Sequence, residues 1–240
     1  MGEKQSFRHE LKYLINYGDK ELLRSRIKDY MDVDSNAESG SYKIRSIYFD
    51  DYWNRAYTDK ITGIQYRKKY RIRFYNDSDK IIKLECKIKN ASWINKISVS
   101  LSRGETDAIM NGEYEFLLRR DERLCHEFYY QCTSRVLRPK CIVDYEREPY
   151  IFENGDVRVT FDNDVRSTAL FKDVFNPDLP SIYVLEPGKL VLEVKFTEYL
   201  PLLIKQLLPS QPTEYQAFSK FVYCLERSAS FNPELRGNSY

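Results

Sequence analysis

The clearest pattern in this sequence is the alternation of charged and apolar positions between Tyr66 and Lys89. Arg71 and Arg73, for example, flank the apolar Ile72. Because successive side chains of a strand point to opposite faces, the alternation predicts two strands that share one apolar and one cationic face. The charged positions are Arg67, Lys69, Arg71, Arg73, Lys83, Glu85, Lys87 and Lys89.

Similar alternation recurs along the chain and predicts eight strands in all. They cover residues 7–15, 44–50, 65–75, 80–89, 95–101, 140–148, 156–162 and 189–196. Apolar residues at helical spacing predict four helical regions. These cover residues 19–31, 105–118, 121–136 and a last region of 201–208 and 212–227. No linker interrupts the chain, so we expect one domain over residues 1–240.

Eight strands with short connections favour an antiparallel meander that closes into a barrel. Two orientations are open: apolar faces can fill the interior, or charges can line a lumen while helices cover the apolar faces from outside. A solvated charged face on an ordinary one-sided sheet is the third reading. Four amphipathic helical regions need an apolar surface to pack on, which favours the charged lumen. The expected fold class is therefore α+β, an eight-stranded antiparallel β-barrel with helices outside.

Composition limits the classes of function. The 38 basic and 36 acidic residues give a formal charge of only +2, so affinity for anions must come from local segregation of charge. The mean hydropathy is −0.60 and no apolar run is long enough to span a bilayer. The five cysteines form no C-x-x-C pair, which argues against a disulfide framework or zinc site and favours a reducing, cytoplasmic setting. A lumen rich in Lys and Arg is costly when empty, so it implies water or an anion.

Eight short motifs in chain order give the sequence a specific resemblance. They are FRHELKY (7–13), SIYFD (46–50), RKKYRIRFY (67–75), ECK (85–87), YER (145–147), RVTFD (158–162), LEVK (192–195) and FSKF (218–221). Together they resemble the VTC domain, the polyphosphate polymerase module of the triphosphate tunnel metalloenzyme (CYTH-like) superfamily. The resemblance covers nearly the whole chain.

The resemblance implies a tunnel that holds a chain of phosphates beside a divalent metal, Mn²⁺ or Mg²⁺. The implied phosphate-binding residues are Lys12, Arg71, Arg73, Lys87, Lys96, Tyr145, Arg147, Arg158, Ser219 and Lys220. Of these, Lys12, Arg71, Arg73, Lys87, Arg147 and Arg158 would act in catalysis together with Glu193. Glu193 would hold the metal, with Glu10 and Glu85 as weaker candidate ligands. Arg suits bidentate phosphate contacts, whereas Lys acts as a compact point charge.

One position departs from the superfamily pattern. Related tunnel triphosphatases begin with E-x-E-x-K, and Arg8 stands here in place of the first glutamate. This change weakens a two-metal hydrolytic site and adds positive charge. Asp162 is expected to pair with Arg158 rather than to bind metal. The pattern leaves the roles of Arg67, Lys69, Lys83 and Lys89 unresolved.

The leading hypothesis is a polyphosphate polymerase whose partners are ATP and inorganic polyphosphate. A tripolyphosphatase or nucleoside triphosphatase in the same tunnel is the enzymatic alternative, and a non-catalytic polyphosphate-binding module is the third. Nucleic acid is not expected as a partner, because a barrel lumen is too narrow for bases. The sequence leaves open a membrane protein partner, the oligomeric state and the choice of metal.

Overall fold

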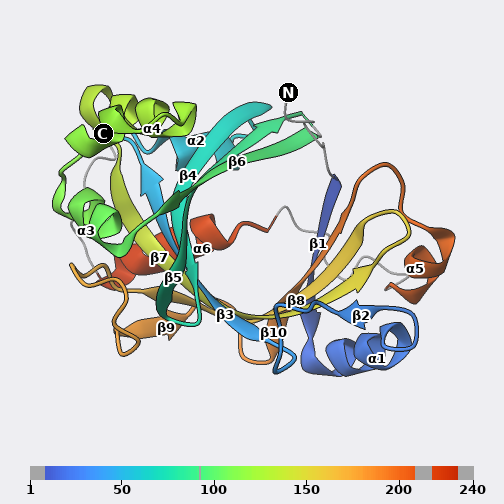
Figure 1. Ribbon diagram of the computed structural model, residues 1–240. Helices are drawn as coiled ribbons and strands as arrows, with labels where there is room; N and C mark the ends of the chain where they lie inside the picture. The colour runs from blue at the N-terminus through green and yellow to red at the C-terminus, as the bar shows by residue number, and fades with distance from the viewer. Residues whose placement is uncertain (1–8, 92, 209–217, 232–240) are drawn as a thin grey trace.

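The computed structural model describes residues 9–91, 93–208 and 218–231, which form one curved antiparallel sheet with helices packed on it (Figure 1). The strands in the described residues are β1 (His9–Asn16), β2 (Asp32–Val33), β3 (Tyr42–Asp50), β4 (Tyr66–Tyr75), β5 (Ser78–Asn90), β6 (Trp93–Leu101), β7 (Arg138–Phe152), β8 (Val157–Thr168), β9 (Ser181–Tyr183) and β10 (Lys189–Phe196). The helices are α1 (Tyr17–Ile27), α2 (Arg55–Ile61), α3 (Arg103–Asn111), the 3-10 helix η1 (Glu115–Arg119), α4 (Arg123–Ser134), α5 (Leu202–Leu207) and α6 (Lys220–Phe231). Within the described ranges, no helix is long and apolar enough to cross a membrane.

The sheet is barrel-like but does not close through backbone hydrogen bonds. Its strand order is β1-β10-β8-β7-β3-β4-β5-β6, so β1 and β6 form the two edges of the described sheet. Side chains bridge this seam instead: the rings of His9 and Trp93 lie 5.6 Å apart, and Lys87 Nζ donates to Glu10 Oε2 at 2.7 Å. All eight predicted strands are present, and the sheet is barrel-like as predicted but not closed, because β1 and β6 do not pair.

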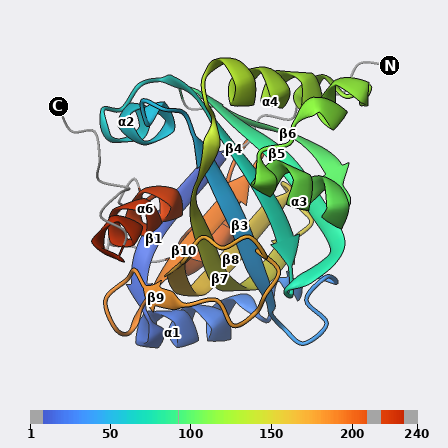
Figure 2. The ribbon, with the colours of Figure 1, turned by 90° about the vertical axis from the view of Figure 1, so that its left-hand side faces the viewer.

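The alternation of β4 and β5 separates an outer apolar face from an inner charged face. On the outer face Ile72, Phe74 and Leu84 are fully buried beneath α3, η1 and α4, which contribute Ile109 and Phe128 to the same core (Figure 2). Full burial of side chains of this size stabilises the fold by about 1.5–3 kcal/mol each. The predicted charged lumen with helices outside is confirmed on this side.

A second outer core lies under α1 and α5. Leu23 and Ile27 of α1 pack with Ile204 of α5 against apolar residues of β1, β8 and β10, among them Phe161 and Leu192. Helix α1 begins with a capping box. The Asn16 side chain accepts from the backbone N–H of Asp19, and the Asp19 carboxylate accepts from the backbone N–H of Asn16.

Helix α6 lies on the inner side of the sheet, which differs from the prediction that the helices all cover the outside (Figure 1). Phe221 and Cys224 pack with Cys141 and Val143, two apolar residues on the same face of β7 as Arg147. The inner face therefore turns apolar at one end of β7, and α6 covers it there. The predicted helix over 212–227 begins outside the described residues, and the described part starts at Lys220.

Helix α2 and the short strands β2 and β9 were not expected from the sequence. The seven residues of α2 have no long apolar stripe, and the buried Asp50 holds the helix instead. Its carboxylate accepts from the backbone N–H groups of Asp51 at 2.9 Å, Ala56 at 2.8 Å and Tyr57 at 3.0 Å. The end of β3 thereby fixes where α2 lies.

We expect Asp50→Ala to lower the free energy of unfolding by about 1–3 kcal/mol for each N–H group left buried without an acceptor. Urea unfolding monitored by circular dichroism measures this loss. Asp79→Ala is the matched control, because the ion pair of Asp79 among the described residues is a partly exposed one with Arg103 at 3.7 Å. That pair is worth about 0–1 kcal/mol. Equal losses in both variants would show that Asp50 does not anchor α2.

Candidate functional site

The concave face of the sheet encloses two cavities that share part of their walls. One, beside α6, has a volume of about 230 Å³, and the other, toward β6, about 880 Å³. Among the described residues, the charged side chains that line both cavities are Glu10, Arg71, Arg73, Lys87, Arg147 and Lys195. We therefore treat the two cavities as one continuous space and call it the tunnel.

The structure places all ten predicted phosphate-binding residues on the wall of the tunnel. Lys12, Tyr145, Ser219 and Lys220 line the cavity beside α6. Lys96 and Arg158 line the cavity toward β6, and Arg71, Arg73, Lys87 and Arg147 line both. Their common location is observed, and their contacts with phosphate stay a prediction.

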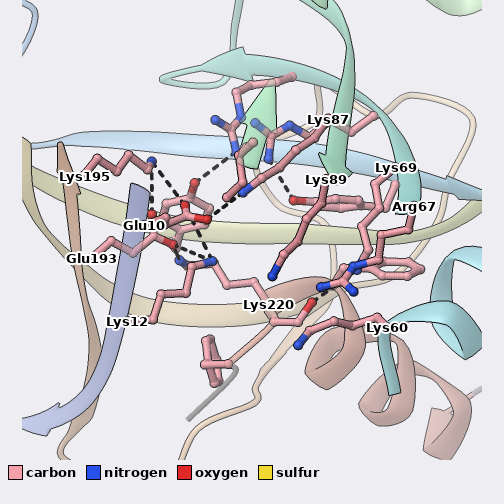
Figure 3. Close-up of a pocket in the computed structure, with 18 of the residues that line it drawn as sticks. Glu10, Lys12, Lys60, Arg67, Lys69, Lys87, Lys89, Glu193, Lys195 and Lys220 are labelled. Atoms are coloured by element: carbon pink, nitrogen blue, oxygen red, sulfur yellow. Dashed lines mark hydrogen bonds and ion pairs between the residues drawn. The ribbon is translucent and has the colours of Figure 1, made fainter. Parts of the chain in front are cut away.

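Two glutamates on neighbouring strands form the centre of one end of the site. Glu193 of β10 lies 3.2 Å from Lys12 Nζ, 3.2 Å from Lys195 Nζ and 2.9 Å from Lys220 Nζ. Glu10 of β1 lies 3.8 Å from Lys12 and 3.7 Å from Lys195, so both lysines bridge the two carboxylates (Figure 3). We call Glu10, Lys12, Glu193, Lys195 and Lys220 the carboxylate pole.

Charge, rather than exposure, keeps the carboxylates of this pole ionised. Burial opposes their ionisation, but the charges of Lys12, Lys220 and Lys195 hold the pKa of Glu193 well below its usual value. Burial also disfavours a charge on Lys12, yet Glu10 and Glu193 raise the pKa of its ammonium group. The pole therefore presents carboxylate oxygens and ammonium groups side by side at neutral pH.

The carboxylate pole fits a divalent ion only in part. A hard cation such as Mg²⁺ takes about six oxygen ligands, and no group of three or more His, Cys, Asp or Glu residues gathers in the described part of the chain. Glu193 and Glu10 remain the predicted protein ligands, and phosphate and water would have to supply the rest. Glu85, the other candidate ligand, lines neither cavity, and its two oxygens are held at 2.6 Å by Arg71 and Lys96.

The buried Arg73 guanidinium is held by neutral groups. Its Nε donates to Ser46 Oγ at 3.0 Å and its Nη2 to the Tyr145 hydroxyl at 3.1 Å. No carboxylate lies within 4.0 Å of it in the ranges that the structure describes. Arg71, by contrast, pairs with Glu85. Arg73 thus brings to the tunnel wall a positive charge that has no ion-pair partner within 4.0 Å among the described residues.

The predicted pairing of Asp162 with Arg158 is wrong. Asp162 accepts from Arg147 at 2.6 and 2.8 Å and from Lys220 at 2.5 Å. Arg158 instead donates to Asp34 at 2.5 Å. The register explains the difference, because Arg147 is directly opposite Asp162 across β7 and β8. Arg158 and Asp162 are four residues apart on one strand, which separates them by about 13 Å.

Four cations at the far side of the cavity beside α6 have a different environment. Lys60, Arg67, Lys69 and Lys89 line it, and none makes an ion pair within 4.0 Å among the described residues. Figure 3 shows them grouped away from Glu10 and Glu193. We call these four residues the free-cation pole.

The sequence left three members of this pole unresolved and missed Lys60, because it did not predict α2. The remaining unresolved lysine, Lys83, lines neither cavity and donates to Ser100 Oγ at 2.7 Å. Arg8, the departure from the superfamily pattern, lies outside the described residues.

Lys69 is the member of this pole whose pKa is lowered most strongly by burial and neighbouring cations. Among the described residues, its ammonium group contacts the Ser219 hydroxyl at 3.4 Å and the ring of Phe221 at 4.6 Å. Burial, followed by the charges of Arg67 and Lys60, lowers the pKa of Lys69 to about 7. Burial and like charges also lower the pKa of Lys60 and Lys89. An anion placed among them would relieve this repulsion.

Comparisons with known proteins agree with this geometry. The model of a family described as the VTC domain matches residues 7–228, whereas no curated protein sequence matches significantly. A solved structure of a candidate adenylate cyclase from Bacillus halodurans is 14% identical, with a TM-score of 0.50, and the match covers 90% of this chain and 100% of that one. A candidate adenylyl cyclase from Hippeastrum, described as having a dominant triphosphatase activity, is 13% identical, with a TM-score of 0.53 and coverage of 93% and 96%. These likenesses show the triphosphate tunnel fold.

We expect the ligand-free protein to become more stable as pH rises from about 7 to about 8, below the range in which thiols of the unfolded chain ionise while burial raises the pKa of the folded cysteines. In this window the unfolded Lys69 still binds a proton that the folded chain has released, and stability rises with pH wherever the unfolded state binds more protons. Lys69→Met should reduce the slope, measured as unfolding free energy in urea at several pH values. An unchanged slope in Lys69→Met would contradict the lowered pKa, and Lys83→Met is the control that should keep the wild-type slope.

Proposed function

Because the chain belongs to the VTC domain family, we propose that it is a polyphosphate polymerase that transfers the γ-phosphoryl group of ATP to a polyphosphate chain. The observation that carries the proposal is the charge of the tunnel. Among the described residues that line the cavity beside α6, eleven are Lys or Arg and two are Glu. Such an excess suits a ligand with several negative charges in a row.

The transfer needs positioning and charge neutralisation more than covalent help from the protein. A terminal oxygen of the chain would attack the γ-phosphorus, the bond from that phosphorus to the bridging oxygen would break, and ADP would leave. Arg73 and Arg71 would donate to phosphoryl oxygens in the middle of the tunnel. Lys12 and Lys220 would approach the same phosphates from the carboxylate pole.

A divalent ion held by Glu193 and Glu10 would neutralise part of the charge on the transferring group. The chain's own residues prepare this position, because the lysines around the two glutamates keep both carboxylates ionised. The Tyr145 hydroxyl accepts from Arg73, which leaves its hydrogen to donate to a phosphate oxygen.

A triphosphatase is the second candidate, and the paired carboxylates of Glu10 and Glu193 favour it. The triphosphatase activity of the Hippeastrum protein, which has the same fold, supports this alternative. Hydrolysis needs an activated water in place of a phosphate acceptor. The replacement of a metal-binding glutamate by Arg8 supports polymerase over hydrolase.

Incubation of the purified protein with ATP and Mn²⁺, with and without a short polyphosphate primer, tests the proposal. We expect metal-dependent formation of ADP together with polyphosphate that lengthens over time, measured by gel electrophoresis and phosphorus NMR. Orthophosphate without chain growth would select the triphosphatase. Binding of polyphosphate with no turnover under any condition would select the non-catalytic module.

We expect Arg73→Lys to lower the kcat/KM for ATP by about 10²–10³-fold, because a lysine cannot reproduce the planar set of donors at the transferring phosphate. The thermal unfolding temperature should fall only by the loss of a hydrogen bond to Ser46 or Tyr145, since the lysine keeps the charge and Arg73 has no carboxylate partner to lose among the described residues. Lys83→Ala, on the neighbouring strand and outside the tunnel wall, should retain wild-type kinetics. Wild-type kinetics in Arg73→Lys would remove Arg73 from the site.

A further inference from the structure

The motif SIYFD on β3 contributes three polar side chains at alternate positions. Ser46 accepts from Arg73, and Asp50 accepts from backbone N–H groups at the start of α2. Tyr48, between them, lines the cavity beside α6, and its hydroxyl accepts a hydrogen bond from Arg71 Nη1 at 2.9 Å. The register explains this contact, because Tyr48 is directly opposite Arg71 across β3 and β4.

The Arg71 guanidinium is held from two sides. Its Nε donates to Glu85 Oε2 at 2.6 Å, and its Nη2 lies 2.6 Å from the same oxygen, while Nη1 donates to Tyr48. A guanidinium has five N–H donors. At least one N–H on each terminal nitrogen therefore makes no hydrogen bond within the described ranges. Two such donors suit two oxygens of one phosphoryl group.

The position of the Tyr48 ring is itself fixed by packing. The ring stacks on Phe221 of α6, with the two centroids 5.1 Å and the two planes 30° apart. Burial opposes ionisation of the phenol, but the charges of Arg71 and Arg73 outweigh burial and lower the pKa of Tyr48. The phenol oxygen is therefore held close to the two central arginines and interacts with both charges.

Arg73 has the same kind of support, because the hydroxyl of Tyr145 on β7 accepts from its Nη2 at 3.1 Å. Each of these two arginines of β4 thus has a tyrosine hydroxyl from another strand. A neutral hydroxyl orients a guanidinium without cancelling its charge, whereas a carboxylate does both. The family resemblance implies a role for Tyr145 and none for Tyr48.

We propose that Tyr48 is a positioning residue, whose hydroxyl holds the Arg71 guanidinium in the orientation that presents its terminal N–H groups to a phosphoryl group in the tunnel. This inference rests on the proposed function only in that the ligand carries phosphoryl oxygens. Without the hydroxyl, the arginine would lose more rotational freedom when it binds, and affinity would fall. Tyr48 acts through Arg71, so its effect on binding requires Arg71.

A double-mutant cycle tests this dependence. Isothermal titration in EDTA, where no metal-dependent turnover occurs, measures tripolyphosphate affinity in the wild type, Tyr48→Phe, Arg71→Ala and the double variant. Tyr48→Phe keeps the ring that stacks on Phe221. We expect it to weaken binding by about tenfold in the wild type and by less than about twofold in Arg71→Ala. Equal weakening in both backgrounds would overturn the proposal, as would wild-type affinity in Tyr48→Phe.

Tyr42 provides the matched control, because its hydroxyl accepts from a different tunnel arginine, Arg158, at 3.0 Å. It lies six residues from Tyr48 on β3, or about 20 Å along the strand. Tyr42→Phe should change the affinity by the same factor with and without Arg71, since distant sites act additively. Loss of both tyrosine effects in Arg71→Ala would overturn the assignment. Arg71→Lys keeps the charge beside Glu85, should give the same result, and replaces Arg71→Ala if that variant does not fold.

The unfolding temperature separates positioning from a structural role. A hydroxyl needed only for stability would lower the unfolding temperature of Tyr48→Phe while the folded variant bound tripolyphosphate as tightly as the wild type. That result would overturn the proposal.

Binding without turnover also separates this inference from the proposed function. Coupling between Tyr48 and Arg71 in a protein that makes no polymer from ATP would support the positioning role and contradict the polymerase. Polymer synthesis by a protein in which Tyr48→Phe leaves the affinity unchanged would support the polymerase and contradict the positioning role.

Discussion

Repulsion among cations on the concave face is the constraint on which the rest of the structure depends. Arg and Lys side chains from β1, β4, β5, β7, β10 and α2 point into one space, and the carboxylates that line it among the described residues, where α6 borders it, are Glu10 and Glu193. Glu85 and Asp162 do not line this cavity, but they pair with Arg71 and Arg147, which do. The apolar faces of the strands consequently lie outside, where α1, α3, α4 and α5 bury them. Helix α6 enters the inner side only where Cys141 and Val143 make it apolar.

The ratio of carboxylates to cations differs between the two ends of the tunnel, and this difference suggests where a ligand would bind. At the carboxylate pole each lysine has a counter-charge within about ion-pair distance, so the pole can form without a ligand. At the other end Lys69 and its neighbours have no such partner among the described residues, and burial with like charge lowers the pKa of Lys69 to about 7. Arg73 lies between the two ends. A linear polyanion could contact the cations of both poles and of Arg73 at successive points along its length.

The sequence predicted the strands well, because alternation with a period of two is a local property of residues such as Ile72 and Arg73. The family resemblance, and not the alternation alone, supplied the ten phosphate-binding candidates, all of which line the tunnel. The sequence did not predict α2, whose start depends on Asp50 hydrogen bonds that no apolar stripe signals. The partner of Asp162 depends on the register of β7 and β8, which pattern alone does not determine. The sequence did not assign Lys60 to the site, because this residue lies on α2.

A crystal structure of the protein with polyphosphate and Mn²⁺ tests the central claim most directly. We predict continuous phosphate density inside the tunnel, from Glu193 past Arg73 toward Lys60, with the anomalous signal of Mn²⁺ beside Glu193 and Glu10. Phosphate bound only on the outer surface, with the tunnel holding none, would contradict it.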